Sequence, residues 1–222
     1  MPIHKNAIIL AAGKSSSFAP FTYERPKGLF KVKGEVLIER QIEQLQEAGV
    51  YDIYIVVGYM KEKFFYLEQK YQDVKLLPTA KFATKGNLYS LFIAREYLGN
   101  TYLCMSDNYF VNNPFKDDNP QNLSYRACVY KSGGFGEFSA TASDAHVITS
   151  VDFGGSNQLS MIGHAYFNEN FSARLRVYLD QEINEFRVSS LFYLGGVLRQ
   201  ACSEFDIKCQ GKNINCLFGL KI

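Results

Sequence analysis

Residues 7–29 read Ala-Ile-Ile-Leu-Ala-Ala-Gly-Lys-Ser-Ser-Ser-Phe-Ala-Pro-Phe-Thr-Tyr-Glu-Arg-Pro-Lys-Gly-Leu. A short apolar run leads into a turn of small and hydroxyl-bearing residues that begins at Gly13, and Lys27 follows further along the chain. A buried strand that opens at its carboxyl end into such a turn presents successive backbone N–H groups to an anion, and a later lysine adds a point charge. The stretch therefore predicts a loop that binds a triphosphate.

The composition of the chain limits the classes of function. Its 222 residues include 24 basic and 22 acidic side chains, for a formal net charge of +2. Proteins whose main partner is a nucleic acid usually carry a concentrated basic surface, so this balance argues against such a partner. A small anionic substrate needs only local charge. The length suits one α/β domain over residues 1–222.

Neither the apolar runs nor the cysteines indicate export or a membrane partner. The first apolar run is shorter than the core of a signal peptide, and no stretch is long enough to cross a bilayer. The cysteines are odd in number and contain no C-x-x-C pair, so we expect neither a disulfide framework nor a zinc site. A cytoplasmic location follows as the expectation. The cysteines are Cys104, Cys128, Cys202, Cys209 and Cys216.

The first half of the chain alternates short runs of β-branched and aromatic residues with segments of helical period. Such runs suit buried parallel strands, and apolar residues three or four positions apart indicate amphipathic helices. This order predicts a mostly parallel sheet with helices on both faces, and ligands of such sheets bind at the carboxyl ends of the strands. The strands are expected at 6–11, 51–57, 74–77 and 101–106, and the helices around Ile38, Ile42 and Leu45 with Gly49 as C-cap, at about 61–72, and around Leu88, Leu91, Phe92 and Leu98.

The pattern changes after residue 115, where polar turns and a Gly133-Gly134-Phe135-Gly136 loop separate strand-like runs. We interpret residues 5–115 as a nucleotide-binding half and residues 116–222 as an acceptor-binding and lid half of the same domain. The runs lie at about 124–130, 137–142, 146–151 and 159–167, and helical stretches at about 171–184 and 189–201.

Several motifs together resemble those of a known enzyme family. Leu10-Ala11-Ala12-Gly13 followed by Pro26-Lys27 is similar to the signature of nucleotidyltransferases, which join an NTP to a phosphorylated sugar or alcohol and release pyrophosphate. Ile55-Val56-Val57-Gly58-Tyr59, Asn87-Leu88-Tyr89-Ser90-Leu91 and Met105-Ser106-Asp107-Asn108-Tyr109 narrow the resemblance to the bacterial CTP:phosphocholine cytidylyltransferases. The resemblance implies a Rossmann-like nucleotidyltransferase α/β/α sandwich. It implies nucleotide binding by Leu10, Ala11, Ala12, Gly13, Lys14, Lys27, Gly58 and Asn87.

The loop departs from the family pattern at two positions. Family members usually have Gly-x-Gly-x-Arg or Gly-x-Gly-Ser-Arg, whereas this chain has Gly13-Lys14-Ser15-Ser16-Ser17. Ser15 adds a side chain where the family leaves the backbone bare, and Ser17 replaces an arginine able to bind phosphate with two hydrogen bonds. Lys14 restores part of that charge as a point charge. We expect triphosphate binding that is weaker than usual for the family.

Asp107 and Lys27 are the residues expected to carry the chemistry. An acidic residue just past a buried strand, beside Asn108, can hold Mg²⁺, which takes one or two carboxylates together with phosphate oxygens and water. The resemblance assigns the metal to Asp107, and it assigns phosphate contact and stabilisation of transition-state charge to Lys27. Each residue has an ordinary alternative, because Ser-Asp-Asn also suits a turn and most lysines are simply exposed.

Two further sets of residues are candidates for recognition of the base and the acceptor. The Asn87 amide can distinguish cytosine from uracil, or it can simply cap the third helix. A quaternary ammonium acceptor needs aromatic faces and no hydrogen-bond donor, with an acidic residue as counter-charge. The acceptor candidates are Tyr89, Tyr109, Tyr130, Tyr166, Tyr193 and Glu137, which could also be core aromatics and an exposed strand glutamate.

A second metal carboxylate is missing from its expected place. The resemblance implies an acidic residue in the C-terminal part, in a stretch such as Tyr-Trp-Asp-Asn, but the corresponding place reads Phe192-Tyr193-Leu194-Gly195. Asp152, Asp180 or Glu182 could replace it. The end of the chain is also an apolar run, where the resemblance implies a charged helix. The histidines do not cluster and are interpreted as structural: His4, His146 and His164.

The expected reaction is CTP + phosphocholine → CDP-choline + pyrophosphate, by in-line attack of the phosphocholine phosphate on the α-phosphorus. No protein nucleophile is required, because catalysis consists of positioning two anions and neutralising the charge that develops. Three alternatives stay open: a sugar 1-phosphate acceptor with another NTP, a catalytically weakened nucleotide-binding relative, and a dinucleotide-dependent oxidoreductase. The last is disfavoured because the chain has no G-x-G-x-x-G motif.

Overall fold

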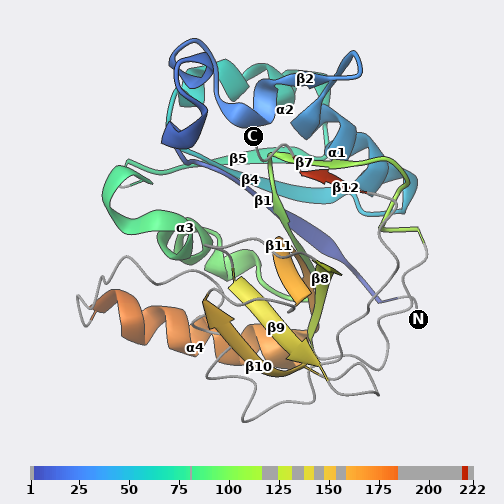
Figure 1. The fold of residues 1–222 in the computed structure, drawn as a ribbon, viewed down its shortest axis with the longest axis vertical. Helices are drawn as coiled ribbons and strands as arrows, with labels where there is room; N and C mark the ends of the chain where they lie inside the picture. Colours follow the sequence, from blue (N-terminus) through green and yellow to red (C-terminus); the bar gives the residue numbers. More distant parts are fainter. Residues whose placement is uncertain are drawn as a thin grey trace.

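The computed structural model describes residues 3–80, 82–116, 125–131, 138–142, 148–153, 159–184 and 217–219. Its centre is a sheet with the strand order β10-β9-β11-β6-β1-β4-β5, in which β8 also pairs with β11 (Figure 1). The strands are β1 (Asn6–Ala11), β4 (Asp52–Val57), β5 (Val74–Pro78), β6 (Thr101–Met105), β8 (Tyr125–Lys131), β9 (Phe138–Ala142), β10 (Ile148–Phe153) and β11 (Leu159–Phe167).

The N-terminal half supplies the parallel part of the sheet. β1 lies between β4 and β6, with Ile9 opposite Ile55 on one side and Cys104 on the other, and β5 extends the sheet beyond β4. The four strands predicted in this half are confirmed. Their unbroken apolar runs are explained by burial on both faces.

The C-terminal half adds antiparallel strands. β11 pairs with β6, with Phe167 opposite Thr101, and β8, β9 and β10 extend the sheet from β11. The four strand-like runs predicted after residue 115 are confirmed, and antiparallel neighbours need no helical crossover, which explains the change of pattern. The first C-terminal helix is α4 (Glu169–Asn184), whereas the helix predicted at 189–201 lies outside the described residues.

Helices cover both faces of the sheet (Figure 1). The helices α1 (Leu37–Glu47) and α2 (Tyr66–Lys70) pack on one face, and α3 (Phe82–Ile93) and α4 pack on the other. Side chains along β1 alternate between the two cores, because Ile8 and Leu10 face α3 and α4 whereas Ile9 faces α1 and α2. These two cores make the α/β/α sandwich that was predicted.

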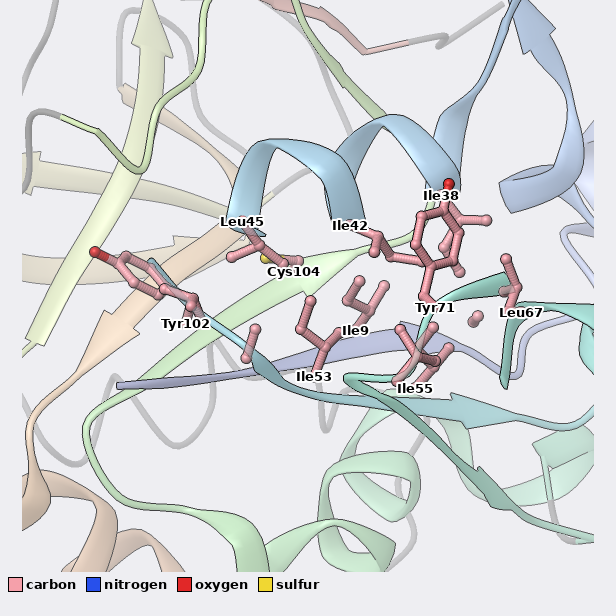
Figure 2. Packing of buried hydrophobic residues seen from close by; sticks show 14 of the residues in the cluster. Ile9, Ile38, Ile42, Leu45, Ile53, Ile55, Leu67, Tyr71, Tyr102 and Cys104 are labelled. Atoms are coloured by element: carbon pink, nitrogen blue, oxygen red, sulfur yellow. The ribbon is translucent and has the colours of Figure 1, made fainter. Parts of the chain in front are cut away.

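The core beneath α1 shows how the predicted apolar stripe is used. Ile38, Ile42 and Leu45 are fully buried and face Ile9 and Ile53 across the sheet surface (Figure 2). The helix ends at Glu47, and Gly49 follows with a φ of +79°, where its N–H donates to the carbonyl of Gln46. The glycine expected to stop this helix is therefore in the left-handed conformation that favours glycine.

Two predicted helices differ from the structure. The segment 61–72 forms a short 3-10 turn, η4 (Lys61–Phe64), followed by α2, so its buried apolar residues belong to two elements. The third helix ends at Ile93, and Leu98 lies beyond another 3-10 turn, η5 (Arg95–Tyr97), in extended backbone. Leu98 is nevertheless buried in the same core as α3, which explains why its spacing resembled a continued helix.

The remaining short elements lie in the loops around the sheet. They are the 3-10 turns η1 (Ser16–Phe18), η2 (Phe21–Tyr23) and η3 (Lys27–Leu29), the hairpin of β2 (Lys31–Val32) and β3 (Glu35–Val36), and the pair of β7 (Asn108–Phe110) and β12 (Leu217–Gly219). β12 falls in the apolar end of the chain and pairs antiparallel with β7, directly after Asp107. Among the described helices, none is long and apolar enough to span a membrane.

Candidate active site

Loops from four neighbouring parallel strands meet at the carboxyl edge of the sheet. Gly13 follows β1, Gly58 follows β4, Thr79 follows β5 and Asp107 follows β6. Backbone hydrogen bonds join these loops: the N–H of Tyr59 donates to the Ala12 carbonyl at 3.0 Å, and the N–H of Ser106 donates to the Leu10 carbonyl at 3.1 Å. Gly13 and Asp107 therefore share this edge of the sheet, where ligands of such sheets were expected to bind.

The two residues expected to carry the chemistry form an ion pair at this edge. The Nζ atom of Lys27 lies 2.7 Å from Oδ2 of Asp107. The lysine side chain is 12% exposed and the aspartate side chain 30% exposed, so the pair is largely enclosed but reachable from solvent. Lys27 also lies over the Phe18 ring, with Nζ 4.3 Å from the ring centroid. A carboxylate can bind a metal ion and an ammonium group can bind a phosphate. The two charges at this edge of the sheet therefore suit a site that binds both.

Close packing explains how Lys27 reaches Asp107. Lys27 begins η3 directly after the buried Pro26, and Gly28 follows. A Cβ atom added to Gly28 would lie 2.9 Å from both Cβ and Oγ of Ser106, nearer than real Cβ atoms approach. Only glycine at position 28 therefore lets η3, which begins at Lys27, contact the turn that carries Asp107.

A second glycine permits close packing behind the Asp107 turn. Gly163 on β11 has a φ of +76°, and a Cβ atom there would lie 2.5 Å from Cγ of Met105. Met105 ends β6 and is followed by the Ser106-Asp107 turn. The sheet on this side is thus shaped to accept the Met105 side chain at the base of the turn.

The phosphate loop has a strained backbone at Ser15. This residue has φ 51° and ψ 53°, in the left-handed region where an L side chain is disfavoured. Its carbonyl accepts hydrogen bonds from the N–H of Phe18 at 2.9 Å and from the hydroxyl of the buried Thr22 at 3.3 Å. The position where the family pattern has glycine is therefore one where glycine would fit better here too.

Most of the nucleotide-binding candidates offer backbone rather than side chains. Leu10, Ala11, Ala12 and Gly58 are buried, whereas Gly13 and Lys14 are exposed. Asn87 is half-buried and follows Gly86, where a φ of +61° and a ψ of −165° interrupt helical geometry. The helix was expected to open at Asn87, but α3 begins at Phe82, and Asn87 starts the helical stretch after the kink at Gly86. This position does not distinguish a capping role from base recognition. The Ser17 side chain is not described.

Two of the acceptor candidates, Tyr109 and Tyr166, are buried in separate places. Tyr109 is buried, its hydroxyl donates to Glu35 at 3.0 Å, and the Arg40 guanidinium lies 4.7 Å from its ring centroid. Burial and the hydrogen bond to Glu35 raise the pKa of Tyr109. Tyr166 is buried on β11, where it lies opposite Tyr102 near the start of β6, at the other end of that strand from Asp107. Both rings already pack in the protein interior, so we do not retain them for the acceptor.

The other acceptor candidates are less constrained by the structure. Tyr89 is half-buried on α3, where it stacks on Phe92 with ring centroids 5.9 Å apart. The backbone of Tyr130 lies in β8, but its side chain is not described. Glu137 and Tyr193 lie outside the described residues.

Of the three candidates for a second metal carboxylate, only Asp180 has a side chain that the structure describes. Asp180 on α4 accepts a hydrogen bond from Nε of Arg95 at 3.0 Å, and Arg95 precedes the start of β6, away from Asp107. The side chains of Asp152 and Glu182 are not described. Within the part of the chain that the structure describes, no group of three or more His, Cys, Asp or Glu side chains is placed to hold a metal ion.

The described histidines have structural surroundings. His4 pairs with Asp52 at 2.7 Å on an exposed part of the chain. His164 is buried among aromatic rings, with Nδ1 3.5 Å from Sγ of the buried Cys104. His146 lies outside the described residues.

Two residues that pack around the carboxyl edge of the sheet were not singled out from the sequence. Gln41 is buried on the apolar side of α1 and donates from Nε2 to two backbone carbonyls of the Asp107 turn. Thr79 is buried after β5, and its hydroxyl has no hydrogen-bond partner among the described residues. A polar residue within an apolar stripe, such as Gln41 between Ile38 and Ile42, is the pattern that could have indicated the first.

Comparison with known proteins places this geometry in a family context. Residues 7–134 match the model of the MobA-like NTP transferase domain. The chain is 30% identical to the choline-phosphate cytidylyltransferase of Streptococcus pneumoniae over 96% of its own length and 91% of that protein. It is 33% identical to a 2-aminoethylphosphonate cytidylyltransferase of Lancefieldella rimae over 91% of its length and 82% of that protein.

A solved structure agrees with these sequence matches. The structure of CTP:phosphocholine cytidylyltransferase from Streptococcus pneumoniae superimposes with a TM-score of 0.89 and 29% identity. The match covers 98% of this chain and 94% of that chain. The similarity thus extends through the C-terminal half, where the motifs of the sequence were sparse.

Proposed function

The chain belongs to the MobA-like NTP transferase family, and from this we propose that it transfers CMP from CTP to phosphocholine, releasing pyrophosphate. It is a nucleotidyltransferase by family. The observation that carries the proposal is the Lys27–Asp107 ion pair, which stands beside the phosphate loop at the carboxyl edge of the sheet. The choice of CTP and phosphocholine is supported by the near full-length similarity to a choline-phosphate cytidylyltransferase.

In the proposed reaction, an oxygen of the phosphocholine phosphate attacks the α-phosphorus of CTP. The new bond is between that oxygen and phosphorus, the bond from the α-phosphorus to the oxygen bridging to the β-phosphate breaks, and pyrophosphate leaves with those electrons. The exposed loop at Gly13 and Lys14 would hold the triphosphate through its N–H groups and the lysine charge. Lys27 would lie against the reacting phosphates, where a positive charge has its largest effect as negative charge develops.

The ion pair also suggests how the site is prepared for its substrates. Without nucleotide, Lys27 and Asp107 neutralise each other at 2.7 Å. A triphosphate would give the lysine ammonium alternative oxygen partners and leave the carboxylate available as a metal ligand. The pairing therefore keeps two opposite charges in place without leaving either one uncompensated.

NTP transferases of this family use a divalent metal ion, and we propose Mg²⁺ on Asp107. The partly exposed carboxylate fits this ion, because Mg²⁺ commonly takes one or two carboxylates and completes its shell with phosphate oxygens and water. When bound, Mg²⁺ would supply positive charge to the phosphate groups. We propose Asp107 as metal ligand, Lys27 as catalytic charge, and Leu10 to Lys14, Gly58 and Asn87 as nucleotide contacts.

A second acceptor is favoured by one observation. The identity to the 2-aminoethylphosphonate cytidylyltransferase is 33%, slightly above that to the choline-phosphate enzyme, although it covers less of the relative. The two acceptors differ at the end away from the phosphorus, where one has a trimethylammonium group and the other a primary amine. A primary amine needs hydrogen-bond acceptors, whereas a quaternary ammonium needs only aromatic faces and negative charge.

Pyrophosphate release with Mg²⁺ tests both the reaction and the acceptor. The assay crosses CTP, UTP, ATP and GTP with phosphocholine, phosphoethanolamine, 2-aminoethylphosphonate and glucose 1-phosphate, and it includes choline as a control that lacks the attacking phosphate. We expect the highest kcat/KM with CTP and phosphocholine. Preference for 2-aminoethylphosphonate would replace the acceptor but keep the reaction. CTP binding without pyrophosphate release for any acceptor would instead indicate a nucleotide-binding relative.

A further inference from the structure

We propose that Gln41 is a positioning residue that fixes the turn carrying Asp107 and thereby sets the metal affinity of the site. This inference rests on the proposed function, because it takes Asp107 as the metal ligand. Gln41 belongs to α1, an element that supplies no candidate ligand for nucleotide or acceptor.

The side-chain amide of Gln41 bridges the two ends of the turn. Its Nε2 atom donates to the carbonyl of Met105 at 3.0 Å and to the carbonyl of Asn108 at 2.8 Å. Ser106 and Asp107 lie between these two carbonyls in sequence. Since both partners are acceptors, the amide nitrogen must face them, and the orientation of the side chain is settled by its contacts.

The side chain of Gln41 that makes this bridge is shielded from solvent. Gln41 is 1% exposed and belongs to the same helix as Ile38 and Ile42, whose side chains face the sheet (Figure 2). Loss of the amide therefore leaves the Met105 and Asn108 carbonyls without this buried donor. The turn would then be free to relax at both ends of the Ser106-Asp107 pair.

The position of Asp107 depends on the anchors around this short turn. Ser106 is tied through its N–H to Leu10 and packs against Gly28, which neighbours Lys27. Gln41 supplies the tie on the helix side of the sheet. Groups that orient a metal ligand from behind typically change metal affinity by about 10–100-fold when they are removed.

Gln44 provides a matched control on the same helix. It is 5% exposed, and its Nε2 atom donates to the Phe110 carbonyl at 3.1 Å. Both glutamines also have a buried Oε1 atom with no hydrogen-bond partner among the described residues. Phe110 lies beyond the Asp107 turn, and its carbonyl accepts a second hydrogen bond from Nε of Arg40 at 2.8 Å.

The test compares Gln41→Met with Gln44→Met, because methionine keeps the length of the side chain and removes the donor. Binding of Mn²⁺ in the presence of CTP and without acceptor is measured by electron paramagnetic resonance, so that no turnover is involved. We expect about tenfold weaker Mn²⁺ binding in Gln41→Met and less than about twofold change in Gln44→Met. In the pyrophosphate assay, Gln41→Met should recover activity as Mg²⁺ is raised, while the KM for phosphocholine stays constant.

Equal Mn²⁺ binding by the two variants would overturn the role of Gln41 while leaving the proposed function intact. If CTP binding by the wild-type protein is independent of Mn²⁺, the proposed metal site on Asp107 is wrong, and the proposed role of Gln41 is wrong with it. If Gln41→Met does not fold, Gln41→Asn replaces it, since the shorter amide cannot span both carbonyls. An Asn variant with wild-type metal affinity would also overturn the inference.

Discussion

Ser15 adopts a backbone conformation that ordinarily belongs to glycine, in the loop expected to hold the triphosphate. We expect Ser15→Gly to raise the free energy of unfolding by about 0.5–1 kcal/mol, because relief of the left-handed strain outweighs the greater freedom of glycine in the unfolded chain. The same change should tighten CTP binding, since the loop N–H groups can then turn toward phosphate without moving a strained side chain. Urea unfolding and CTP titration measure the two effects.

Lys33 is the control for relief of a left-handed backbone away from the triphosphate loop. It has a φ of +52° in the β2–β3 hairpin, outside the triphosphate loop. Lys33→Gly should therefore raise stability by a similar amount with unchanged CTP affinity. Unchanged CTP affinity in Ser15→Gly as well would show that the strain at Ser15 has no bearing on the nucleotide.

Lys27 is expected to act on the transition state more than on bound CTP. Lys27→Ala should lower kcat by at least about 10²-fold, because it removes charge where charge develops, with less than about tenfold loss of CTP affinity. Steady-state kinetics with a separate CTP-binding measurement distinguish these effects. Lys14→Ala, at an exposed loop position, is the comparison and should weaken CTP binding more than turnover. A Lys27 variant with weaker CTP binding and normal kcat would make its role one of ground-state binding.

Gly28 separates the effect of close packing from that of charge. Gly28→Ala places a methyl group 2.9 Å from the Ser106 side chain, so the turns that carry Lys27 and Asp107 must move apart. We expect turnover to fall by at least about tenfold, since small displacements of catalytic groups are costly. The double variant Gly28→Ala/Ser106→Gly removes the opposing side chain and should recover most of that activity. Failure of the double variant to recover would mean that the contact with the Ser106 backbone, at 3.3 Å, is the limiting one.

Single residues were predictable where a local motif carried the information. Lys27 and Asp107 could be selected because each stands in a recognisable stretch of sequence, and their ion pair agrees with that choice. The roles proposed for Gln41 and Gly28 depend on contacts with the distant Asp107 turn, which no local pattern contains. Tyr109 and Tyr166 show the converse limit, because sequence does not distinguish an aromatic ring that faces a ligand from one that fills the core.

At the scale of elements, helix α1 is joined to α2 by a charged cluster. The Glu39 carboxylate accepts hydrogen bonds from the Tyr66 hydroxyl and from Nζ of Lys70, both at 2.6 Å. Burial alone would raise the pKa of Glu39, but the hydrogen bonds from Lys70 and Tyr66 outweigh it and hold the pKa below its ordinary value of 4.5. The hydrogen bond to Glu39 in turn raises the pKa of Lys70. The ionised pair therefore favours the folded state.

Glu39→Gln should expose this contribution through its dependence on pH. The contribution is present above the unfolded-state pKa of Glu39, near 4.5, and is lost as pH falls through the lower folded-state pKa. We expect the variant to be less stable at pH 7 by about 0.5–1 kcal/mol, a modest value because Lys70 is 46% exposed. The difference should shrink as the pH falls below 4.5, because the folded-state carboxylate is then protonated as well. Urea unfolding across pH measures it, and a difference that stays constant to pH 3 would contradict an ionic origin.

Element boundaries were predictable to the extent that burial followed local periodicity. The strands of the parallel sheet are buried on both faces, so their apolar runs matched the structure closely. The helix predicted at 61–72 failed as a single element, because buried Phe64 and Leu67 belong to a 3-10 turn and a short helix. The third helix was predicted to include Leu98 for a related reason. Leu98 is buried by tertiary packing, and such burial does not require a helix.

At the scale of the whole molecule, β1 joins the two cores and the candidate site. Its side chains alternate between the core under α1 and α2 and the core under α3 and α4, and its carboxyl end opens into the phosphate loop. A strand shared by both cores couples the loop to the main body of the protein. We propose that residues 1–222 act as one domain, which should unfold in a single cooperative transition.

Nucleotide binding should therefore raise the stability of the whole molecule. A ligand at 100 times its Kd adds about 2.7 kcal/mol to the free energy of unfolding, and this corresponds to a Tm increase of roughly 5–10 °C for a chain of this size. We expect that increase of Tm with CTP and Mg²⁺ together, and a smaller one with CTP and EDTA.

Asp107→Asn keeps the shape of the side chain but loses the charge that binds the metal. Its Tm with CTP should therefore be the same with Mg²⁺ and with EDTA, and its turnover should fall by at least about 10²-fold. Calorimetry with matched nucleotide concentrations measures the Tm values, and the pyrophosphate assay measures turnover. A full Mg²⁺-dependent increase of Tm in the Asp107→Asn variant would assign the metal to another carboxylate.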